Sequence, residues 1–253
     1  MTENSPLRRR DKRVLLSVIM PAYNEEGSIV GAVVDVKQHI FAAQPSVELL
    51  VIDDGSTDAT AELLAGIAAK DSRVRVVSQE NSGHGAAVMR GLQEAEGEIF
   101  LLLDSDRQIR LDEFGNHLTS FQNDGLDALL GIRKPRQDPA HRLVITRLMR
   151  LLIGLMFSAA PRDAGVPYKL VRRSAWNRFK PLIRQNCWIP SVLIALIMLR
   201  NFPYVTREVT VTHLKRESGT STLNVRRLTV FCAHAVTDLF DLRRRIGKIG
   251  KSH

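Results

Sequence analysis

The sequence predicts an α/β protein built on a mostly parallel, doubly wound sheet. Apolar segments of strand length alternate four times with helix-like segments in the first half of the chain, and the connections between them are short. The run Ile99–Leu103 is apolar throughout, as expected of a strand that is buried on both faces of a parallel sheet. A chain of 253 residues is long enough for one large domain of this kind.

The predicted elements of the first half follow from this alternation. The predicted strands cover residues 14–20, 47–53, 74–79 and 99–103. A helix is expected to begin at Asn24 or Glu25 after the first strand, and another after the second strand, with Ser56 or Thr57 as its N-cap.

The second half is less regular. It contains a strand that leads into a basic loop (127–136), a strongly apolar helix (141–159) and a strand-like segment (205–214). We divide the chain into a basic N-terminal tail (1–13), a main domain (14–225) and a basic, amphipathic C-terminal tail (226–253). In that last tail, arginines and lysines alternate with apolar residues, which predicts contact with an anionic membrane surface.

Composition narrows the class of protein. The formal net charge of +9 calls for an acidic partner or an anionic surface, and the 44% hydrophobic content is that of a soluble globular protein. No segment reaches the roughly 18 continuous apolar residues of a membrane span. The N-terminus lacks the apolar stretch of a signal peptide. Cys187 and Cys232 fit neither a disulfide framework nor a zinc site.

Paired carboxylates follow two of the predicted strands. Asp104 and Asp106 come directly after Ile99–Leu103, and Asp53 and Asp54 end the second strand. The carboxyl ends of parallel strands are where open α/β sheets bind their ligands. One pair could hold a divalent cation against a diphosphate, and the other could accept hydrogen bonds from a ribose or a base. From these residues alone, a solvated turn that merely ends a strand is an equal alternative.

A hydride-transferring dinucleotide fold fits less well. Such a fold needs a glycine-rich turn directly after its first strand, so that the phosphates meet a helix N-terminus. Here that turn reads PAYNEEG and places carboxylates in the path of the phosphates. The later NSGHGAAVMRG has Val88 where the third glycine would stand. Nucleic-acid binding is also disfavoured, because the acidic loops would face the same partner.

Four motifs in order carry a resemblance to a known family. They are SVIMPAYNEE, LLVIDDGSTDAT, NSGHGAAVMRGLQEAEGE and LLLDSDRQ. Together they resemble a family 2 glycosyltransferase with the GT-A fold, over roughly residues 14–225. The pieces GIRKPRQDPAHR, RDAGVPYKLVRR and HLKRESGTS resemble the branch of dolichol-phosphate mannose synthases and polyprenyl-phosphate glycosyltransferases.

The resemblance implies roles for individual residues. The residues implied in donor binding are Pro21, Ala22, Tyr23, Glu25, Asp53, Asp54, His84, Asp104, Arg216 and Ser221. Asp104, Asp106 and Gln108 would hold Mg²⁺ or Mn²⁺ against the donor diphosphate, and Asp106 would be central to catalysis. Arg133 and Arg147 would bind the acceptor phosphate.

The chain departs from the family pattern in three places. Thr222 stands where a lysine often closes the late loop motif, and His84 stands where a lysine is common. The first change puts one donor contact in doubt, and the second leaves the role of His84 open. The QxxRW signature of processive synthases is missing, which disfavours polymerisation.

The acceptor can be argued from chemistry. A sugar hydroxyl needs a general base to remove its proton, whereas a phosphate monoester is already an anionic nucleophile at neutral pH. The second half is rich in arginine, which grips phosphate well, and offers only Asp138 or Asp163 as a base. We therefore expect transfer of mannose, glucose or an N-acetylhexosamine from a GDP- or UDP-sugar to polyprenyl phosphate, with inversion.

Two alternative functions stay open. One alternative is a glycosyltransferase that acts on a hydroxyl acceptor of a glycan or glycolipid. The other is a noncatalytic partner subunit that keeps the fold, against which the intact acidic loops weigh. A polyprenyl-phosphate enzyme is expected at the cytoplasmic face of a membrane, where a small membrane protein could be its partner.

Overall fold

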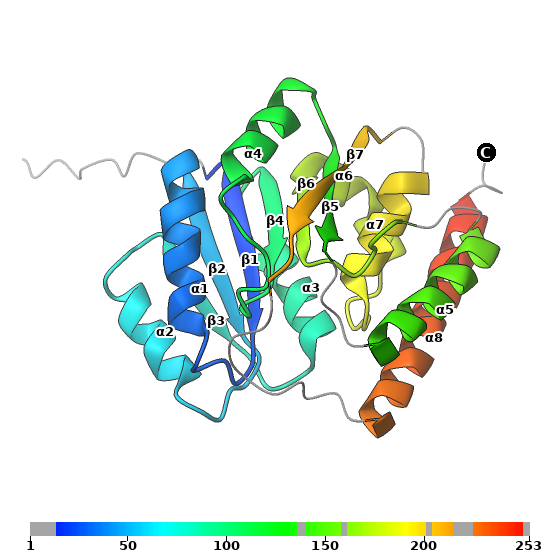
Figure 1. Ribbon diagram of the computed structural model, residues 1–253, viewed down its shortest axis with the longest axis horizontal. Coiled ribbons are helices and arrows are strands. Elements are labelled where there is room, and N and C mark those ends of the chain that lie inside the picture. The colour runs from blue at the N-terminus through cyan, green and yellow to red at the C-terminus, as the bar shows by residue number, and fades with distance from the viewer. Residues whose placement is uncertain (1–13, 136–139, 158–160, 201–203, 215–224, 250–253) are drawn as a thin grey trace, which may run out of the picture.

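One seven-stranded sheet forms the centre of the protein, with strand order β3-β2-β1-β4-β6-β5-β7 (Figure 1). The structure is a computed structural model that describes residues 14–135, 140–157, 161–200, 204–214 and 225–249. The strands are β1 (Leu16–Ala22), β2 (Val47–Asp53), β3 (Val74–Ser78), β4 (Ile99–Leu103), β5 (Ala128–Lys134), β6 (Tyr168–Arg172) and β7 (Thr206–Thr212). The helices are α1 (Ile29–Asp35), η1 (Val36–Phe41), α2 (Thr60–Ala68), α3 (His84–Glu94), α4 (Phe114–Asn123), α5 (Ala140–Phe157), α6 (Arg173–Phe179), η2 (Lys180–Leu182), α7 (Pro190–Arg200) and α8 (Val225–Ile249).

The predicted fold class is confirmed. Strands β1 to β4 are parallel, and β7 is parallel to β5. Only β6 runs against its neighbours among the described strands, since it is antiparallel to both β4 and β5. The sequence analysis assigned no strand to β6. It joins the two parallel parts into one mixed sheet.

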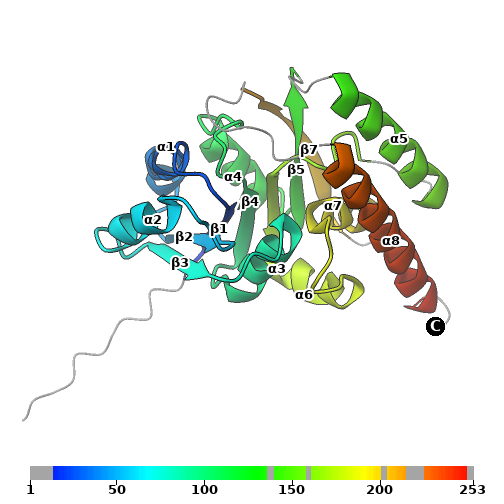
Figure 2. The same ribbon diagram turned by 90° about the horizontal axis from the view of Figure 1, so that it is seen from below.

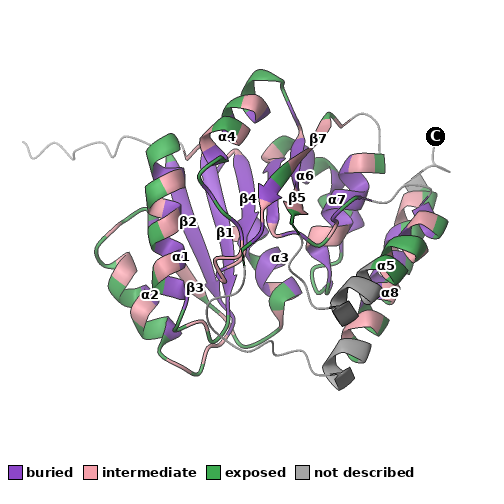
Figure 3. Cartoon of the chain, viewed as in Figure 1, coloured by how far each residue is buried: buried purple, intermediate pink, exposed green. Residues whose placement is uncertain are grey.

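Helices cover both faces of the sheet (Figure 2). Successive residues of a strand point to opposite faces, so Val18 and Ile19 of β1 enter different core clusters. Val18 packs in the cluster that includes α1, α2 and α4, whereas Ile19 packs in the cluster that includes α3, α6 and α7. The central strands are accordingly buried along their whole length (Figure 3).

The long helices α5 and α8 lie side by side at the end of the sheet that β5 and β7 form (Figures 1 and 2). Ala235, Leu239 and Leu242 of α8 are buried in the same core cluster as Phe157 of α5. Part of the segment 226–253 therefore packs on the main domain, while its contact with a membrane stays a prediction. No helix in the described part of the chain has the length and apolar character needed to cross a bilayer.

Two predicted helix starts are wrong. Helix α1 begins at Ile29, after Asn24 and Glu25, and α2 begins at Thr60, so that neither Ser56 nor Thr57 is its N-cap. These polar residues instead join the two loops. The hydroxyl of Ser56 accepts a hydrogen bond from the Asn24 amide at 3.1 Å, and the Asn24 side chain accepts one from the Thr57 amide at 2.8 Å.

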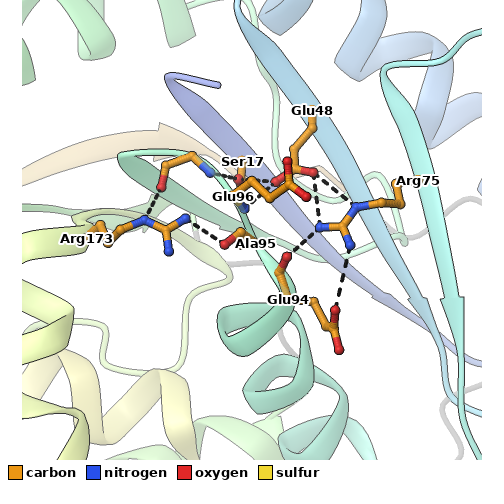
Figure 4. Close-up of polar contacts among 8 residues, drawn as sticks. Ser17, Glu48, Arg75, Glu94, Ala95, Glu96 and Arg173 are labelled. Carbon is orange, nitrogen blue, oxygen red and sulfur yellow. Dashed lines mark hydrogen bonds and ion pairs between the residues drawn. The ribbon is translucent and has the colours of Figure 1, made fainter. Parts of the chain in front are cut away.

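A buried polar network holds the sheet together near the amino ends of its parallel strands (Figure 4). The Glu48 carboxylate on β2 accepts hydrogen bonds from the Ser17 hydroxyl, from the Glu96 amide at 2.7 Å and from Arg75 Nε at 3.2 Å. Arg173 of α6 donates to the carbonyl oxygens of Ala95 and Gly97, each at 2.6 Å. The network ties three adjacent strands to the turn that precedes β4.

Candidate functional site

Strands β2, β1 and β4 are neighbours in the sheet, and their carboxyl ends place the predicted acidic residues together at one edge. Ala22 of β1 is in register with Asp53 of β2, and β4 lies on the other side of β1. Asp53 and Asp54 are buried, each with 3% of its surface exposed. Asp104 follows the last residue of β4 and is partly exposed.

The two aspartates at the carboxyl end of β2 form different hydrogen bonds. Asp54 Oδ1 accepts hydrogen bonds from Gln79 Nε2 at 2.7 Å and from the Ser82 amide at 2.9 Å, and Oδ2 accepts one from the Gly83 amide at 2.8 Å. Asp53 Oδ1 accepts one from the Ser56 amide at 3.1 Å. Asp54 therefore shapes the loop before α3, which makes Asp53 the better candidate to contact a donor nucleoside.

The turn after β1 contains the other predicted nucleoside contacts. Pro21 and Ala22 are buried at the end of the strand, whereas Tyr23 is 41% exposed. Glu25 donates its amide to Thr60 Oγ1 at 2.8 Å, and its carboxylate accepts a hydrogen bond from the Ser28 hydroxyl at 2.6 Å. The Tyr23 ring is thus exposed in this turn, and hydrogen bonds to both its backbone and its side chain hold Glu25 in place.

His84 links the start of α3 to the end of β4. Its Nε2 lies 3.0 Å from Asp104 Oδ1. Desolvation lowers the pKa of His84, but the charge of Asp104 and its hydrogen bond, together with the charges of Asp106 and Asp54, outweigh this effect and raise the pKa. When the ring is protonated, its charge adds to the partial positive charge of the helix N-terminus, and the two together attract an anionic group.

Asp106 and Gln108 lie on the turn that follows Asp104. Asp106 Oδ1 accepts a hydrogen bond from the Gln108 amide at 3.1 Å, and the Gln108 carbonyl accepts one from the Leu214 amide at 2.8 Å. Leu214 is the last described residue before the late loop. The predicted donor contacts Arg216 and Ser221 lie outside the described residues.

The donor atoms of this turn fit a hard divalent cation. Asp104 and Asp106 supply carboxylate oxygens, which Mg²⁺ and Mn²⁺ prefer. In the part of the chain that the structure describes, no three side chains of the His, Cys, Asp or Glu type gather into a metal centre. Proteins usually bind Mg²⁺ through one or two carboxylates, and substrate phosphates and water complete its coordination. The two aspartates therefore suit a cation that arrives with a diphosphate.

Arg133, predicted to bind the acceptor phosphate, lies on β5 in a buried ion pair. Its Nε is 2.8 Å from Asp163 Oδ2 and its Nη2 is 2.9 Å from Asp163 Oδ1. The two side chains are 14% and 2% exposed. This ion pair joins β5 to the segment before β6, which is a structural role. Binding of an acceptor by Arg133 stays a prediction.

Arg147, the other predicted acceptor contact, lies on an exposed face of α5. It lines a surface pocket with Arg150, Leu151, Gly154 and Leu155. Leu151 and Leu155 are 62% and 74% exposed, so their apolar surface faces outward beside the two arginines. This face combines positive charge with a stripe of exposed leucine, an arrangement that suits an anionic head group with an apolar chain.

Arg107 is a residue of the site that the sequence analysis missed. It adopts the left-handed conformation with φ 58° and forms an ion pair with Asp35 of α1, with 2.8 Å between Nε and Oδ2. Asp35 and Arg107 are separated by 72 positions. No local sequence signal connects them.

Comparisons with known proteins bear on the family and the fold of this chain. The model of the family described as glycosyl transferase family 2 matches residues 17–184. An undecaprenyl-phosphate 4-deoxy-4-formamido-L-arabinose transferase of Pseudomonas aeruginosa (strain LESB58) is 31% identical over 216 residues, which cover 85% of this chain. The chain spans only 62% of the length of that relative.

Two solved structures illustrate the structural likeness. A glucosyl-3-phosphoglycerate synthase of Mycobacterium tuberculosis aligns with a TM-score of 0.63 at 21% identity, over 90% of this chain and 80% of that chain. A mannosyltransferase of Pyrobaculum calidifontis, solved with GDP-Man and Mn²⁺, aligns with a TM-score of 0.59 at 16% identity, over 89% of this chain and 62% of that chain. At these identities the likeness establishes the fold.

Proposed function

Because the chain belongs to glycosyl transferase family 2, we propose that it transfers a sugar from a nucleoside diphosphate donor to a polyprenyl phosphate. The acidic edge of the sheet supports the donor half of this proposal. In this proposal Tyr23 and Asp53 contact the nucleoside, and Asp104 and Asp106 face the diphosphate with Mg²⁺ or Mn²⁺. The bound cation would supply electrostatic stabilisation of the charge that develops on the leaving diphosphate.

The face of α5 is the observation that carries the acceptor half. Arg147 and Arg150 could neutralise a phosphate head group, while the exposed Leu151 and Leu155 could lie against an apolar chain. The relative from Pseudomonas aeruginosa, whose name includes undecaprenyl phosphate, supports the same class of acceptor.

The surroundings of Asp163 argue against a hydroxyl acceptor. Such an acceptor needs a base, and the sequence offers Asp138, which lies outside the described residues, or Asp163. Asp163 is 2% exposed and engages Arg133 through both carboxylate oxygens, so it is poorly placed to accept a proton from a sugar hydroxyl.

The proposed reaction is a single in-line displacement. An oxygen of the acceptor phosphate attacks the anomeric carbon, the bond from that carbon to the donor diphosphate breaks, and its electron pair leaves with the diphosphate, which inverts the configuration. His84 and Asp104 would orient the diphosphate, and Arg147 would orient the nucleophile. We place the enzyme at the cytoplasmic face of a membrane, with α8 toward the lipid and room for a small membrane-protein partner.

The test is the transfer of labelled sugar from GDP- and UDP-sugars into lipid that can be extracted with organic solvent. Membranes containing polyprenyl phosphate would be incubated with wild type, Asp106→Ala and the control Asp112→Ala, with and without Mn²⁺. Asp112 is 45% exposed and pairs with Arg110 near the same turn, so its loss should leave transfer unchanged. Label in the lipid phase that requires metal and is lost only in Asp106→Ala supports the proposal, and the active donor names the sugar.

Other outcomes point elsewhere. Label in soluble glycans but not in lipid would favour the hydroxyl-acceptor enzyme. Binding of a nucleotide sugar without any transfer would favour a noncatalytic subunit.

A further inference from the structure

The turn that presents Asp106 contains a backbone conformation that its residue does not favour. Arg107 has φ 58°, in the left-handed region. A residue with a Cβ enters this region at a cost, because the Cβ crowds the neighbouring carbonyl oxygen. Glycine or asparagine would meet the same geometry with less strain. The arginine must therefore gain something from contacts made by its side chain.

The described contacts of this side chain include an ion pair with helix α1. Arg107 Nε lies 2.8 Å from Asp35 Oδ2, and its Nη2 lies 3.5 Å from Oδ1. Gly31 precedes Asp35 by one helical turn, on the same face of α1. A Cβ at Gly31 would lie 2.9 Å from Arg107 Nη1 and 3.0 Å from its Cζ. The glycine thus leaves space for the guanidinium that the aspartate binds.

The same turn fixes Asp106. Its Oδ1 accepts the amide hydrogen of Gln108 at 3.1 Å, in a local turn that spans Arg107. If Arg107 rotated out of the left-handed region, the Gln108 amide would move and the Asp106 carboxylate would lose its orientation. Asp35, Asp104, Asp106 and Arg107 line one common pocket, so the ion pair and the two acidic side chains are adjacent.

We propose that Arg107, Asp35 and Gly31 form a latch that holds the Asp106 carboxylate in its binding orientation. Arg107 is then a positioning residue that acts through Asp106. The inference rests on the proposed function in that the benefit of the latch is tighter binding of a divalent cation with a nucleoside diphosphate. Its structural part, the fixed turn, can be tested without any ligand.

Four variants separate the latch from its alternatives. Arg107→Ala removes the ion pair and keeps the strain, whereas Arg107→Gly removes both. Asp35→Asn weakens the pair and leaves the arginine in place. Arg110→Ala is the matched control, because Arg110 pairs with Asp112 near the same turn and is 52% exposed.

The first readout is hydrogen exchange of the Gln108 amide in the ligand-free protein, followed by NMR, with thermal unfolding to confirm that each variant is folded. The latch predicts faster exchange in Arg107→Ala and Asp35→Asn, a smaller change in Arg107→Gly, and no change in Arg110→Ala. Wild-type exchange rates in both Arg107→Ala and Asp35→Asn would overturn the latch, whatever the protein binds.

The second readout is the affinity for Mn²⁺ with UDP or GDP, measured by calorimetry. A turn that is correctly formed only part of the time weakens the apparent affinity by that fraction, so we expect a loss of about tenfold in Arg107→Ala and less in Arg107→Gly. Asp35→Asn should weaken binding in the same direction. If Arg107 contacted the diphosphate itself, Arg107→Gly would lose as much as Arg107→Ala while Asp35→Asn bound as wild type, and the latch would be wrong.

The two readouts fail independently. A wild type that binds neither Mn²⁺–UDP nor Mn²⁺–GDP would count against the proposed function, whereas the exchange of Gln108 would still decide the latch. A wild type that binds, with variants that bind equally well and exchange equally slowly, would overturn the latch alone.

Discussion

The guanidinium of Arg133 and the carboxylate of Asp163 face each other in a two-pronged ion pair, with nitrogen–oxygen distances of 2.8 and 2.9 Å. The Arg133 amide also donates to Asp163 Oδ2, at 3.2 Å. Asp163 thereby fixes both the backbone and the side chain of the last part of β5. One carboxylate therefore positions both the end of β5 and Arg133, the arginine predicted to bind the acceptor.

Asp163→Asn should destabilise the protein. Removing one charge of a buried pair leaves the other without compensation, which costs about 3 kcal/mol of unfolding free energy. Urea unfolding measures this loss. Asp112→Asn, which breaks a surface pair with Arg110, should change stability by less than about 1 kcal/mol. Equal effects of the two substitutions would contradict the structural role given to Asp163.

Glu48→Gln should also lower stability, through the network of Figure 4. The amide cannot match the carboxylate as acceptor for Ser17, Arg75 and the Glu96 amide, so a buried donor loses its partner at a cost of about 2 kcal/mol. Chemical denaturation compares it with Glu62→Gln, a change at an exposed position on α2. An unchanged midpoint for Glu48→Gln would show that the network contributes little.

Gly85→Ala should disturb the start of α3. A Cβ there would lie 2.3 Å from the Cys187 carbonyl oxygen and 2.8 Å from that of Trp188, and both are backbone atoms that cannot simply rotate away. We expect a loss of about 1–3 kcal/mol and weaker binding of nucleoside diphosphate, because His84 precedes this glycine. Thermal unfolding and calorimetry measure the two effects.

Gly66→Ala is the matched control for that substitution. Gly66 lies in α2 with nothing within 4 Å of its added Cβ, so alanine should raise stability by about 0.5–1 kcal/mol. If both variants lost stability, the effect would come from replacing glycine in general and not from the contact at Gly85.

Lys169 should make stability depend on pH. Its side chain is fully buried on β6, where its Nζ donates to the Val166 carbonyl and to the Ser191 hydroxyl, and burial lowers its pKa to about 7. In the unfolded chain the pKa is about 10.4, so between these two values the unfolded state binds the extra proton. The unfolding free energy therefore rises with pH across this window, by up to about 1.4 kcal/mol per unit.

Lys169→Met removes that contribution. The difference in unfolding free energy between wild type and Lys169→Met should move in favour of wild type from pH 7 to about pH 10. The exposed Lys180→Met serves as control and should show a flat difference over the same range. A flat difference for Lys169→Met as well would mean that the buried amine keeps its ordinary proton affinity.

Features that depend on residues close together in the sequence were predicted better than features that depend on distant residues. Apolar runs such as Ile99–Leu103 predicted the parallel strands, because burial on both faces leaves a pattern within a few residues. The same reasoning placed Asp104 and Asp106 at the carboxyl end of β4. The start of α2 was wrong because Ser56 and Thr57 bond to Asn24 on another loop, an alternative that local propensity does not contain.

Pairs of distant polar residues could not be predicted in this way. Arg107 and Asp35 are 72 positions apart, and Arg133 and Asp163 are 30 apart. Each residue alone is compatible with a solvated surface position. Only the folded sheet brings the partners together, so their contribution to the site becomes visible only in three dimensions.

The contact of α8 with the loop before α7 bears on how this protein can be divided. Asp238 of α8 accepts hydrogen bonds from the Trp188 and Ile189 amides at 2.6 and 3.3 Å, and the Trp188 ring stacks on His234 at 4.2 Å. That loop in turn touches Gly85, next to His84. The family match ends at residue 184, yet these later residues pack against the start of α3, where the candidate site residue His84 lies. A fragment trimmed to the matched region would lack Ala235, Leu239 and Leu242 and would expose the part of the core that they cover, so we expect it to be less stable than the whole chain.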